Sequence, residues 1–254
     1  MLKFGKDVHI ESGVTINVTD GFIGDRSIIR SGVRIEGNSV ILGRESYLDH
    51  GALIGGGSCF DTCAFLNAGD WLHMGWNSQI NIARGVCIGD EVGIGIETKI
   101  LTHGAYLPID YGFPVQWGKV KIGNRVWLPH AWVNPGVTIG NDVVVTAMSL
   151  VNTNLESGCL YGGIPVKKIK SNVYPKLDVS GYTLLENQIP FKVQKKGECF
   201  LIAVYDVAVF NLTYRTINGR VTLDTIFVQN QLRRNGIRFK YAVKDGVYVP
   251  WQEY

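Results

Sequence analysis

Aliphatic and aromatic residues recur at every sixth position over most of the chain, and a small or polar residue such as Gly or Asn often follows them directly. An amphipathic helix would place apolar residues at i, i+3, i+4 and i+7, and a strand with one buried face would alternate. The pattern fits neither of these. Its first part runs through Ile23, Ile29, Ile35, Leu42, Leu48, Ile54, Phe60, Leu66, Leu72, Ile82, Ile88, Ile94 and Ile100.

A fixed six-residue period is typical of a parallel β-helix, in which each coil consists of three short strands and places one apolar residue of each strand inside. Neighbouring coils stack about 4.8 Å apart, and each buries its apolar residues only against the next. Gly and Asn at the corners allow the positive φ that tight bends need. We therefore predict a mainly β fold, a left-handed parallel β-helix with a smaller C-terminal α+β module.

The repeat is interrupted four times. Its phase slips between Ile35 and Leu42 and between Leu72 and Ile82, where we expect bulges or short outward loops. After Ile100 it stops, resumes at Ile122 and Leu128, and then slips by one residue to Val133, Ile139, Val145 and Val151. The long gap predicts an extruded loop over residues 103–119, rich in Pro and aromatic residues. Long loops in compact domains are usually functional.

From about residue 171 the repeat disappears, so we assign residues 1–172 to the β-helix and 173–254 to the α+β module. Strands are expected within 199–217. Thr222 is expected to cap a helix that ends near Gly236 and in which Ile226, Phe227 and Leu232 share one face. Asp245-Gly246 predicts a hairpin turn.

Composition narrows the function classes. With 46% hydrophobic and 19% charged residues the chain is globular, and a formal net charge of +3 on scattered Lys and Arg argues against nucleic-acid binding. Five cysteines without CxxC spacing favour neither disulfides nor a zinc site. The start MLKFGKDVHIES lacks the apolar region of a signal peptide, and the longest apolar run is short. We expect a cytoplasmic protein without membrane insertion.

Three segments, KILTHGAYLP, VKIGNRVWLPHAWVNPGVTIG and VVVTAMSLVNTNLESGCLYGGIPVKKIK, follow one another between Asn77 and Lys170. In this order and spacing they resemble the hexapeptide-repeat acyltransferases, especially the sugar and polysaccharide O-acetyltransferases. The resemblance implies acetyl-CoA as cosubstrate, no metal, and a sugar, oligosaccharide or polysaccharide acceptor. It also implies a homotrimer with active sites between its subunits.

In the family, the general base is a histidine just after the strand that precedes the extruded loop, and His103 occupies that place. An unperturbed imidazole has a pKa near neutrality and suits removal of a proton from an acceptor hydroxyl. The alternative is a histidine that merely caps the loop. The resemblance and the neighbouring residues suggest four further acceptor or supporting side chains, Asn77, His130, Tyr106 and Trp117.

The segment Gly162–Ile169 resembles the family's closing motif, whose backbone and basic side chain meet the nucleotide end of CoA. The CoA-binding residues implied are Trp127, Ala147, Met148, Gly163, Pro165, Lys167 and Lys168. Pro129, Thr146 and Met148 depart from the family, which usually has Gly there. A bulky Met148 would narrow the pantetheine groove, select a particular acyl group, or mark a chain that does not bind CoA.

The sequence therefore predicts an acetyl-CoA-dependent O-acetyltransferase that acts on a sugar or polysaccharide hydroxyl by direct transfer, with His103 as the general base. One alternative is an N-acetyltransferase of an amino sugar nucleotide, which the same base and groove would serve. The other is a non-catalytic β-helix scaffold or glycan-binding protein, suggested by Thr146 and Met148.

Overall fold

A computed structural model describes residues 1–172, 178–180 and 193–251. The chain divides into two compact units, residues 1–175 and 176–254, which we describe separately. The boundary expected after residue 172 adjoins residues 173–177, which lie outside the described part. Within the described residues, no helix is long and apolar enough to span a membrane.

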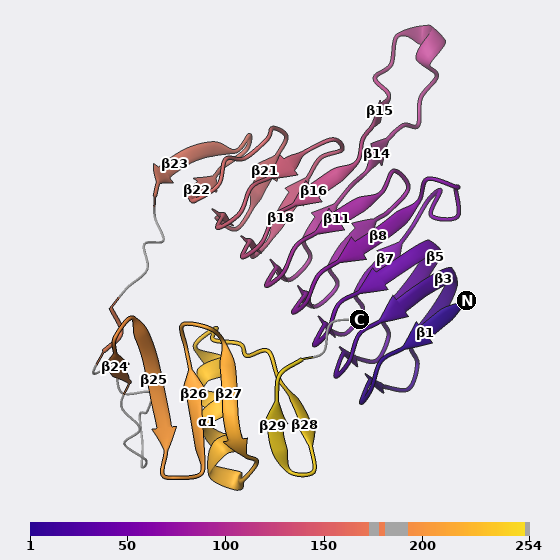
Figure 1. Ribbon diagram of the computed structural model, residues 1–254. Coiled ribbons are helices and arrows are strands. Elements are labelled where there is room, and N and C mark those ends of the chain that lie inside the picture. Colours follow the sequence, from indigo (N-terminus) through magenta and orange to yellow (C-terminus); the bar gives the residue numbers. More distant parts are fainter. Residues whose placement is uncertain (173–177, 181–192, 252–254) are drawn as a thin grey trace. The chain divides into compact units, whose positions relative to one another are not determined.

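Unit 1 is a parallel β-helix whose coils stack along one axis (Figure 1). One face is a nine-stranded sheet closed by an antiparallel strand, and it contains β2 (His9–Ile10), β4 (Ile28–Ile29), β6 (Tyr47–Leu48), β9 (His73–Met74), β12 (Gly93–Ile94), β17 (Trp127–Leu128), β20 (Val144–Val145), β22 (Cys159–Gly162) and β23 (Lys167–Ser171).

The other two faces form one twelve-stranded sheet, because β3 (Thr15–Ile23) and β5 (Arg34–Leu42) run across the corner between them. The second face continues with β7 (Leu53–Gly55), β10 (Gln79–Asn81), β13 (Lys99–Ile100), β18 (Ala131–Val133) and β21 (Ser149–Val151). The third face continues with β1 (Leu2–Phe4), β8 (Phe65–Ala68), β11 (Val86–Ile88), β16 (Val120–Ile122) and β19 (Thr138–Ile139).

Equivalent residues of successive coils pair in register, so the inward side chains form columns. On the first face Leu48 pairs with Met74, Met74 with Ile94, and Ile94 with Leu128, and all four side chains are fully buried. Burying one such side chain contributes about 1.5–3 kcal/mol. These columns confirm the predicted fold class, a left-handed parallel β-helix followed by a smaller α+β module.

Two details of the predicted repeat are wrong. Phe60 is 50% exposed, because residues 56–64 form an outward loop between β7 and β8. The repeat passes through Ala68, Met74 and Ile80, which pair in register with coils on both sides, and it continues at Ile88, so the slip lies between Ile80 and Ile88 and not between Leu72 and Ile82. Leu66, Leu72 and Ile82 are also buried, and this second set of apolar residues hid the true phase.

No outward loop separates Ile35 from Leu42 either, because both belong to the unbroken strand β5. The chain turns the corner at Gly37, whose φ of 146° is open to glycine and unfavourable for other residues.

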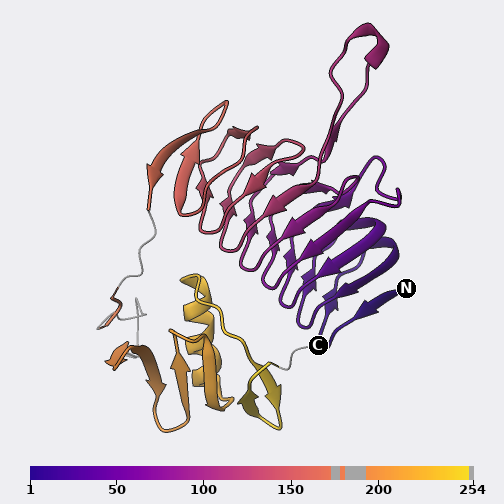
Figure 2. The same ribbon diagram turned by 45° about the horizontal axis from the view of Figure 1, so that its top comes forward.

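Two insertions leave the helix at the same corner, which connects the second face to the third. Residues 56–64 connect β7 to β8, and residues 101–119 connect β13 to β16. The longer insertion is a projecting hairpin (Figure 2) in which β14 (His103–Gly104) pairs with β15 (Gln116–Trp117) and whose tip carries the 3-10 helix η1 (Ile109–Tyr111).

Unit 2 is a six-stranded antiparallel sheet with one helix, α1 (Leu223–Arg234). The strands, in spatial order, are β24 (Gln194–Lys196), β25 (Cys199–Val204), β26 (Ala208–Asn211), β27 (Thr216–Arg220), β29 (Val247–Val249) and β28 (Ala242–Lys244). The predicted strands and the turn at Asp245-Gly246 are confirmed.

The helix begins as predicted, because the Thr222 side chain accepts a hydrogen bond from the Thr225 backbone N–H. Its buried face was predicted wrongly in part. Thr225, Val228 and Leu232 are buried, whereas Ile226 is 42% exposed. Positions three and four apart share a helix face, so the stripe that contains Leu232 excludes Ile226.

Candidate active site

His103 is the first residue of β14 and lies at the base of the hairpin, partly buried. Its Nδ1 is 3.1 Å from Oδ1 of Asn81, the last residue of β10. The imidazole stacks on the Trp117 indole, with ring centroids 4.7 Å apart and an interplanar angle of 16°. The cross-strand pair His103–Trp117 produces this stack, because directly opposed residues of a hairpin lie side by side.

Two hydrogen bonds of the Asn81 amide, and a third that orients Thr102, fix the direction of this amide. Its Nδ2 donates to the Gly57 carbonyl at 3.2 Å. The Thr102 hydroxyl accepts from the Arg84 backbone N–H at 3.2 Å and donates its own proton to Asn81 Oδ1. The amide oxygen of Asn81 therefore faces His103.

This orientation determines the tautomer of the neutral imidazole. Because Asn81 Oδ1 can only accept, His103 Nδ1 carries the proton and donates it, and the lone pair lies on Nε2. Nε2 points toward Gly57, where an added Cβ would lie 3.6 Å from it. The glycine leaves room for a small group beside the basic nitrogen.

The surroundings of His103 lower its pKa below the usual value. Burial, which disfavours the charged imidazolium, is the largest cause, and the nearby positive charge of Arg84 acts in the same direction. The Asp61 carboxylate opposes them. The imidazole is thus held as the free base at neutral pH.

Asn81, Arg84, Asp61 and Cys63 belong to this cluster and were missed from the sequence. Arg84 Nη1 lies 3.0 Å from Asp61 Oδ2 and 3.1 Å from Cys63 Sγ. The only signal in the sequence was Asn81, a polar residue between Ile80 and Ile82. The contacts of Asp61 and Cys63 depend on the 56–64 loop, which the pattern did not reveal.

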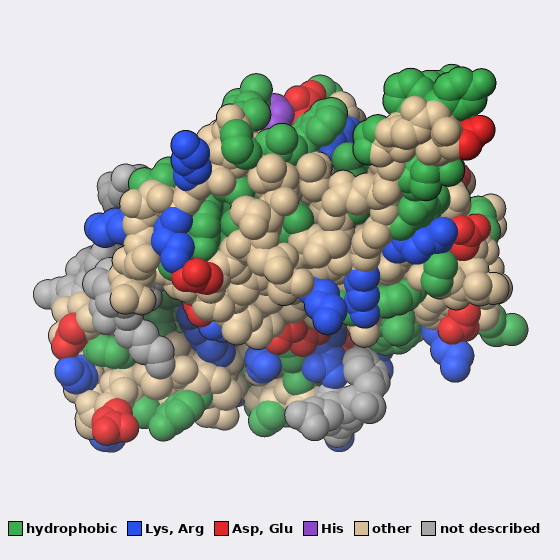
Figure 3. Space-filling view, turned by 90° about the horizontal axis from the view of Figure 1, so that it is seen from above, with side chains coloured by type: hydrophobic (Ala, Val, Ile, Leu, Met, Phe, Trp, Pro, Cys, Tyr) green, Lys and Arg blue, Asp and Glu red, His purple; other side chains and the backbone are tan. Residues whose placement is uncertain are grey.

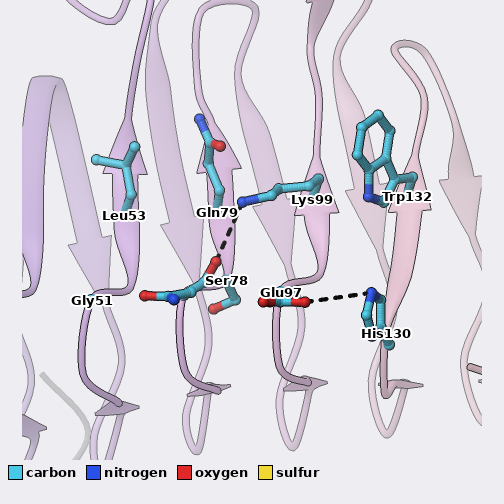
Figure 4. A pocket seen from close by; sticks show the side chains of 9 residues that line it. Gly51, Leu53, Ser78, Gln79, Glu97, Lys99, His130 and Trp132 are labelled. Atoms are coloured by element: carbon cyan, nitrogen blue, oxygen red, sulfur yellow. Dashed lines mark hydrogen bonds and ion pairs between the residues drawn. The ribbon is translucent and has the colours of Figure 1, made fainter. Parts of the chain in front are cut away.

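Asn77 and His130 do not join His103. They line a groove of about 490 Å³ on the outer side of the second face, together with Glu97, Lys99 and Trp132 (Figure 4). His130 Nε2 is 3.9 Å from Glu97 Oε2, and Lys99 Nζ donates to the Asn77 carbonyl at 3.4 Å. The groove lies at the N-terminal ends of β10, β13 and β18, whereas His103 lies beyond the C-terminal end of β13.

The two aromatic residues predicted for the acceptor site lie at different places on the hairpin. Trp117 contacts His103, but Tyr106 lies near the hairpin tip and is 96% exposed. Apolar side chains gather on this tip (Figure 3). The exposed ones are Tyr106, Leu107, Ile109, Tyr111, Phe113 and Val115.

The residues expected to bind CoA lie in the last coils. Trp127 is on the first face, with its ring over Gly93. Ala147 and Met148 form a corner, where Met148 has φ 57°, is 65% exposed and donates its N–H to the His130 carbonyl at 2.7 Å. This corner therefore continues the edge on which the groove lies.

The closing segment is an antiparallel turn between β22 and β23. Gly163 has φ 101°, and its N–H donates to the Ser149 hydroxyl at 3.0 Å. Pro165 follows a cis peptide bond. Lys167 is exposed, whereas the Lys168 ammonium pairs with Glu156.

No family model matches the chain. The chain is similar to the galactoside O-acetyltransferase of Escherichia coli (strain K12), with 28% identity over 133 residues that cover 47% of this chain and 63% of that protein. It is 31% identical over 112 residues to the putative lipopolysaccharide biosynthesis O-acetyl transferase WbbJ of the same strain, covering 40% of this chain and 55% of that protein. The matched regions thus span less than two thirds of either relative.

A crystal structure of a hexapeptide-repeat containing acetyltransferase from Vibrio cholerae O1 biovar eltor, complexed with acetyl-CoA, is 26% identical with a TM-score of 0.42 and covers 51% of this chain and 69% of that chain. In its six-residue repeat, its parallel coils and its sequence similarity to the two Escherichia coli proteins, the β-helical unit resembles the hexapeptide-repeat acetyltransferases.

Proposed function

We propose that the chain is an acetyl-CoA-dependent O-acetyltransferase that modifies a hydroxyl of a sugar, oligosaccharide or polysaccharide. The observation that supports it best is the imidazole of His103, whose Nδ1–H is held by Asn81 and whose Nε2 lies beside Gly57, which has no side chain to cover it. The O-acetyltransferase names of the two curated relatives support the choice of a hydroxyl over an amine.

In the proposed reaction the acceptor hydroxyl lies against His103 Nε2 and attacks the thioester carbonyl of acetyl-CoA. The new C–O bond forms while the hydroxyl proton passes to Nε2, and the imidazolium keeps its hydrogen bond to Asn81 Oδ1. The C–S bond then breaks, and the CoA sulfur takes the proton from Nε2. No covalent acyl-enzyme is needed, and His103 returns to the free base.

For the donor we propose the corner and closing turn of the last coils. Gly163 and Pro165 hold backbone close to the ligand, and Lys167 offers a cation for a phosphate. Trp127, Ala147 and Met148 would flank the pantetheine arm. Lys168 would reach a phosphate only by leaving Glu156.

We further propose a homotrimer, in which the His103 site of one subunit faces the donor groove of the next. The exposed apolar side chains of the hairpin tip support this, because contiguous exposed apolar surface marks interaction sites.

The test is acetyl-CoA turnover against a panel of oligosaccharides, followed by thiol release and product mass. His103→Ala should lower turnover by about 10²- to 10⁴-fold, the usual contribution of a general base, and should leave CoA affinity measured by calorimetry nearly unchanged. His130→Ala is the matched control and should retain turnover.

Three other outcomes would change the proposed function. Unchanged turnover in His103→Ala would move the base elsewhere. Acetylation of an amino sugar nucleotide, with no O-acetylated product, would support the N-acetyltransferase alternative. No detectable CoA binding by the unmodified chain would leave a scaffold or glycan-binding protein.

A further inference from the structure

Arg84 lies where the two insertions of the helix meet. It follows β10 at the corner from which the hairpin and the 56–64 loop leave in neighbouring coils. Its Nη1 donates to Asp61 Oδ2 at 3.0 Å, to Cys63 Sγ at 3.1 Å and to the Ala83 carbonyl at 2.9 Å. Three acceptors, two of them on the loop, hold the guanidinium in one place.

The guanidinium also contacts the hairpin. Its Cζ lies 4.0 Å from the centroid of the Trp117 ring, at cation–π distance. The same ring stacks on His103. A chain of contacts thus runs from Asp61 through Arg84 and Trp117 to the imidazole.

We propose that Arg84, held by Asp61, is a positioning residue for the transfer reaction: it fixes Trp117 against His103 and places a positive charge beside this stacked pair. This inference rests on the proposed function, since it supposes that His103 is the base. Neither Arg84 nor Asp61 touches the reacting atoms in this assignment.

The charged groups around His103 come from three elements, the loop with Asp61 and Cys63, the corner with Arg84, and the hairpin. Arg84 lowers the pKa of His103 and Asp61 raises it, while burial makes the largest contribution. Of the side-chain surfaces of Arg84 and Asp61, 32% and 45% are accessible. Solvent therefore screens part of the effect of both charges on His103.

The test is an NMR titration of the His103 ring in three variants of the full chain, which needs no substrate. Arg84→Met keeps the side-chain length and removes the charge, so the midpoint should move to higher pH. Asp61→Asn removes the opposing charge, so the midpoint should move to lower pH. Arg84→Lys should return the midpoint toward that of the unmodified chain.

A matched control is available in Arg125→Met, which breaks the Arg125–Asp142 ion pair at a different corner and should leave the midpoint in place. Midpoints that stay unchanged in both Arg84→Met and Asp61→Asn, or that move in the same direction, would overturn the proposal. Asp61→Asn is nearly isosteric and keeps the test available if Arg84→Met folds poorly.

Turnover distinguishes this proposal from the proposed function. If both hold, the acid limb of kcat/KM shifts in the same directions as the NMR midpoints. If the NMR midpoints move in opposite directions while neither the variants nor the unmodified chain transfer acetyl groups, the effect of Arg84 and Asp61 on His103 stands, and the proposed acetyl transfer fails.

Discussion

At the scale of single residues, the chemistry of His103 depends on the direction of one amide. Asn81 could present either its oxygen or its nitrogen to the imidazole, and the Gly57 carbonyl and the Thr102 hydroxyl select the oxygen. A reversed amide would donate a hydrogen bond to Nδ1 and leave the ring proton on Nε2, where the proposed reaction needs a lone pair. Under the proposed function, residues that never meet the acceptor therefore decide whether His103 can act as the base.

Gly57 gives this view a direct test. Gly57→Ala places a methyl group 3.6 Å from His103 Nε2 without a clash, and its backbone conformation accepts alanine. We expect turnover to fall by about 10²-fold or more, because the methyl group occupies the space of the acceptor hydroxyl. Displacing a reacting group by about 1 Å can lower the rate by that factor. The measurement is kcat/KM for transfer, with CoA affinity as the internal reference.

Gly104→Ala is the matched control. It lies next to His103, and an added Cβ there meets nothing within 4 Å. It should keep its turnover and melting temperature. Equal activity of Gly57→Ala and the unmodified chain would place the acceptor on another side of the imidazole.

His103 could be proposed from the sequence because it lies at the start of the long break in the repeat. Asn81 could not, because its contact with His103 arises only when β13 stacks on β10, and residue spacing does not show it once loops interrupt the period. The sequence suggested Asn77 in its place. Asn77 is close to Asn81 in sequence, but it lies at the opposite end of β10, where it lines the groove. In a fold of very short strands, a shift of a few residues moves a side chain to a different corner.

At the scale of elements, the strands of the helix are too short to be stable alone. Most contain two or three residues, so their stability comes from the columns of inward side chains in neighbouring coils. The sequence displayed these columns as the six-residue period. The sequence did not show which apolar residues form one column, because Leu66 and Leu72 are buried beside the in-register residues Ala68 and Met74.

The columns predict a strong contrast between two isoleucines. Ile80→Ala removes a fully buried side chain from β10 and should lower the free energy of unfolding by about 2–5 kcal/mol. Ile41→Ala removes the same atoms from β5 at a 40% exposed position and should cost well under half as much. Urea unfolding followed by circular dichroism measures both. Similar losses in the two variants would contradict the assignment of the inward column.

At the scale of the whole molecule, the hairpin tip presents apolar side chains that the single chain leaves exposed. Ile109 is 72% exposed. If the tip docks on another subunit, as we propose, the chain should sediment with three times its 28.1 kDa mass. Ile109→Ser should then shift the equilibrium toward smaller species, because it removes apolar area from the contact.

Leu223→Ser serves as the control, since Leu223 is 86% exposed in unit 2 and lies outside the hairpin. It should leave the mass unchanged. A monomeric mass for the unmodified chain at micromolar concentration would contradict the trimer and would require a site completed within one chain.

Both insertions leave the helix at one corner, and each departs from one coil and returns to the next without changing the register of the columns. Lineages that share this scaffold could therefore lengthen, shorten or exchange such segments while the core stays intact. Under the proposed function, acceptor choice and folding then evolve as nearly independent traits. For protein engineering, the natural place for a combinatorial library is residues 57–63 with Cys59 kept, because the Cys59 side chain is buried in the core whereas variation at the other positions changes what reaches His103.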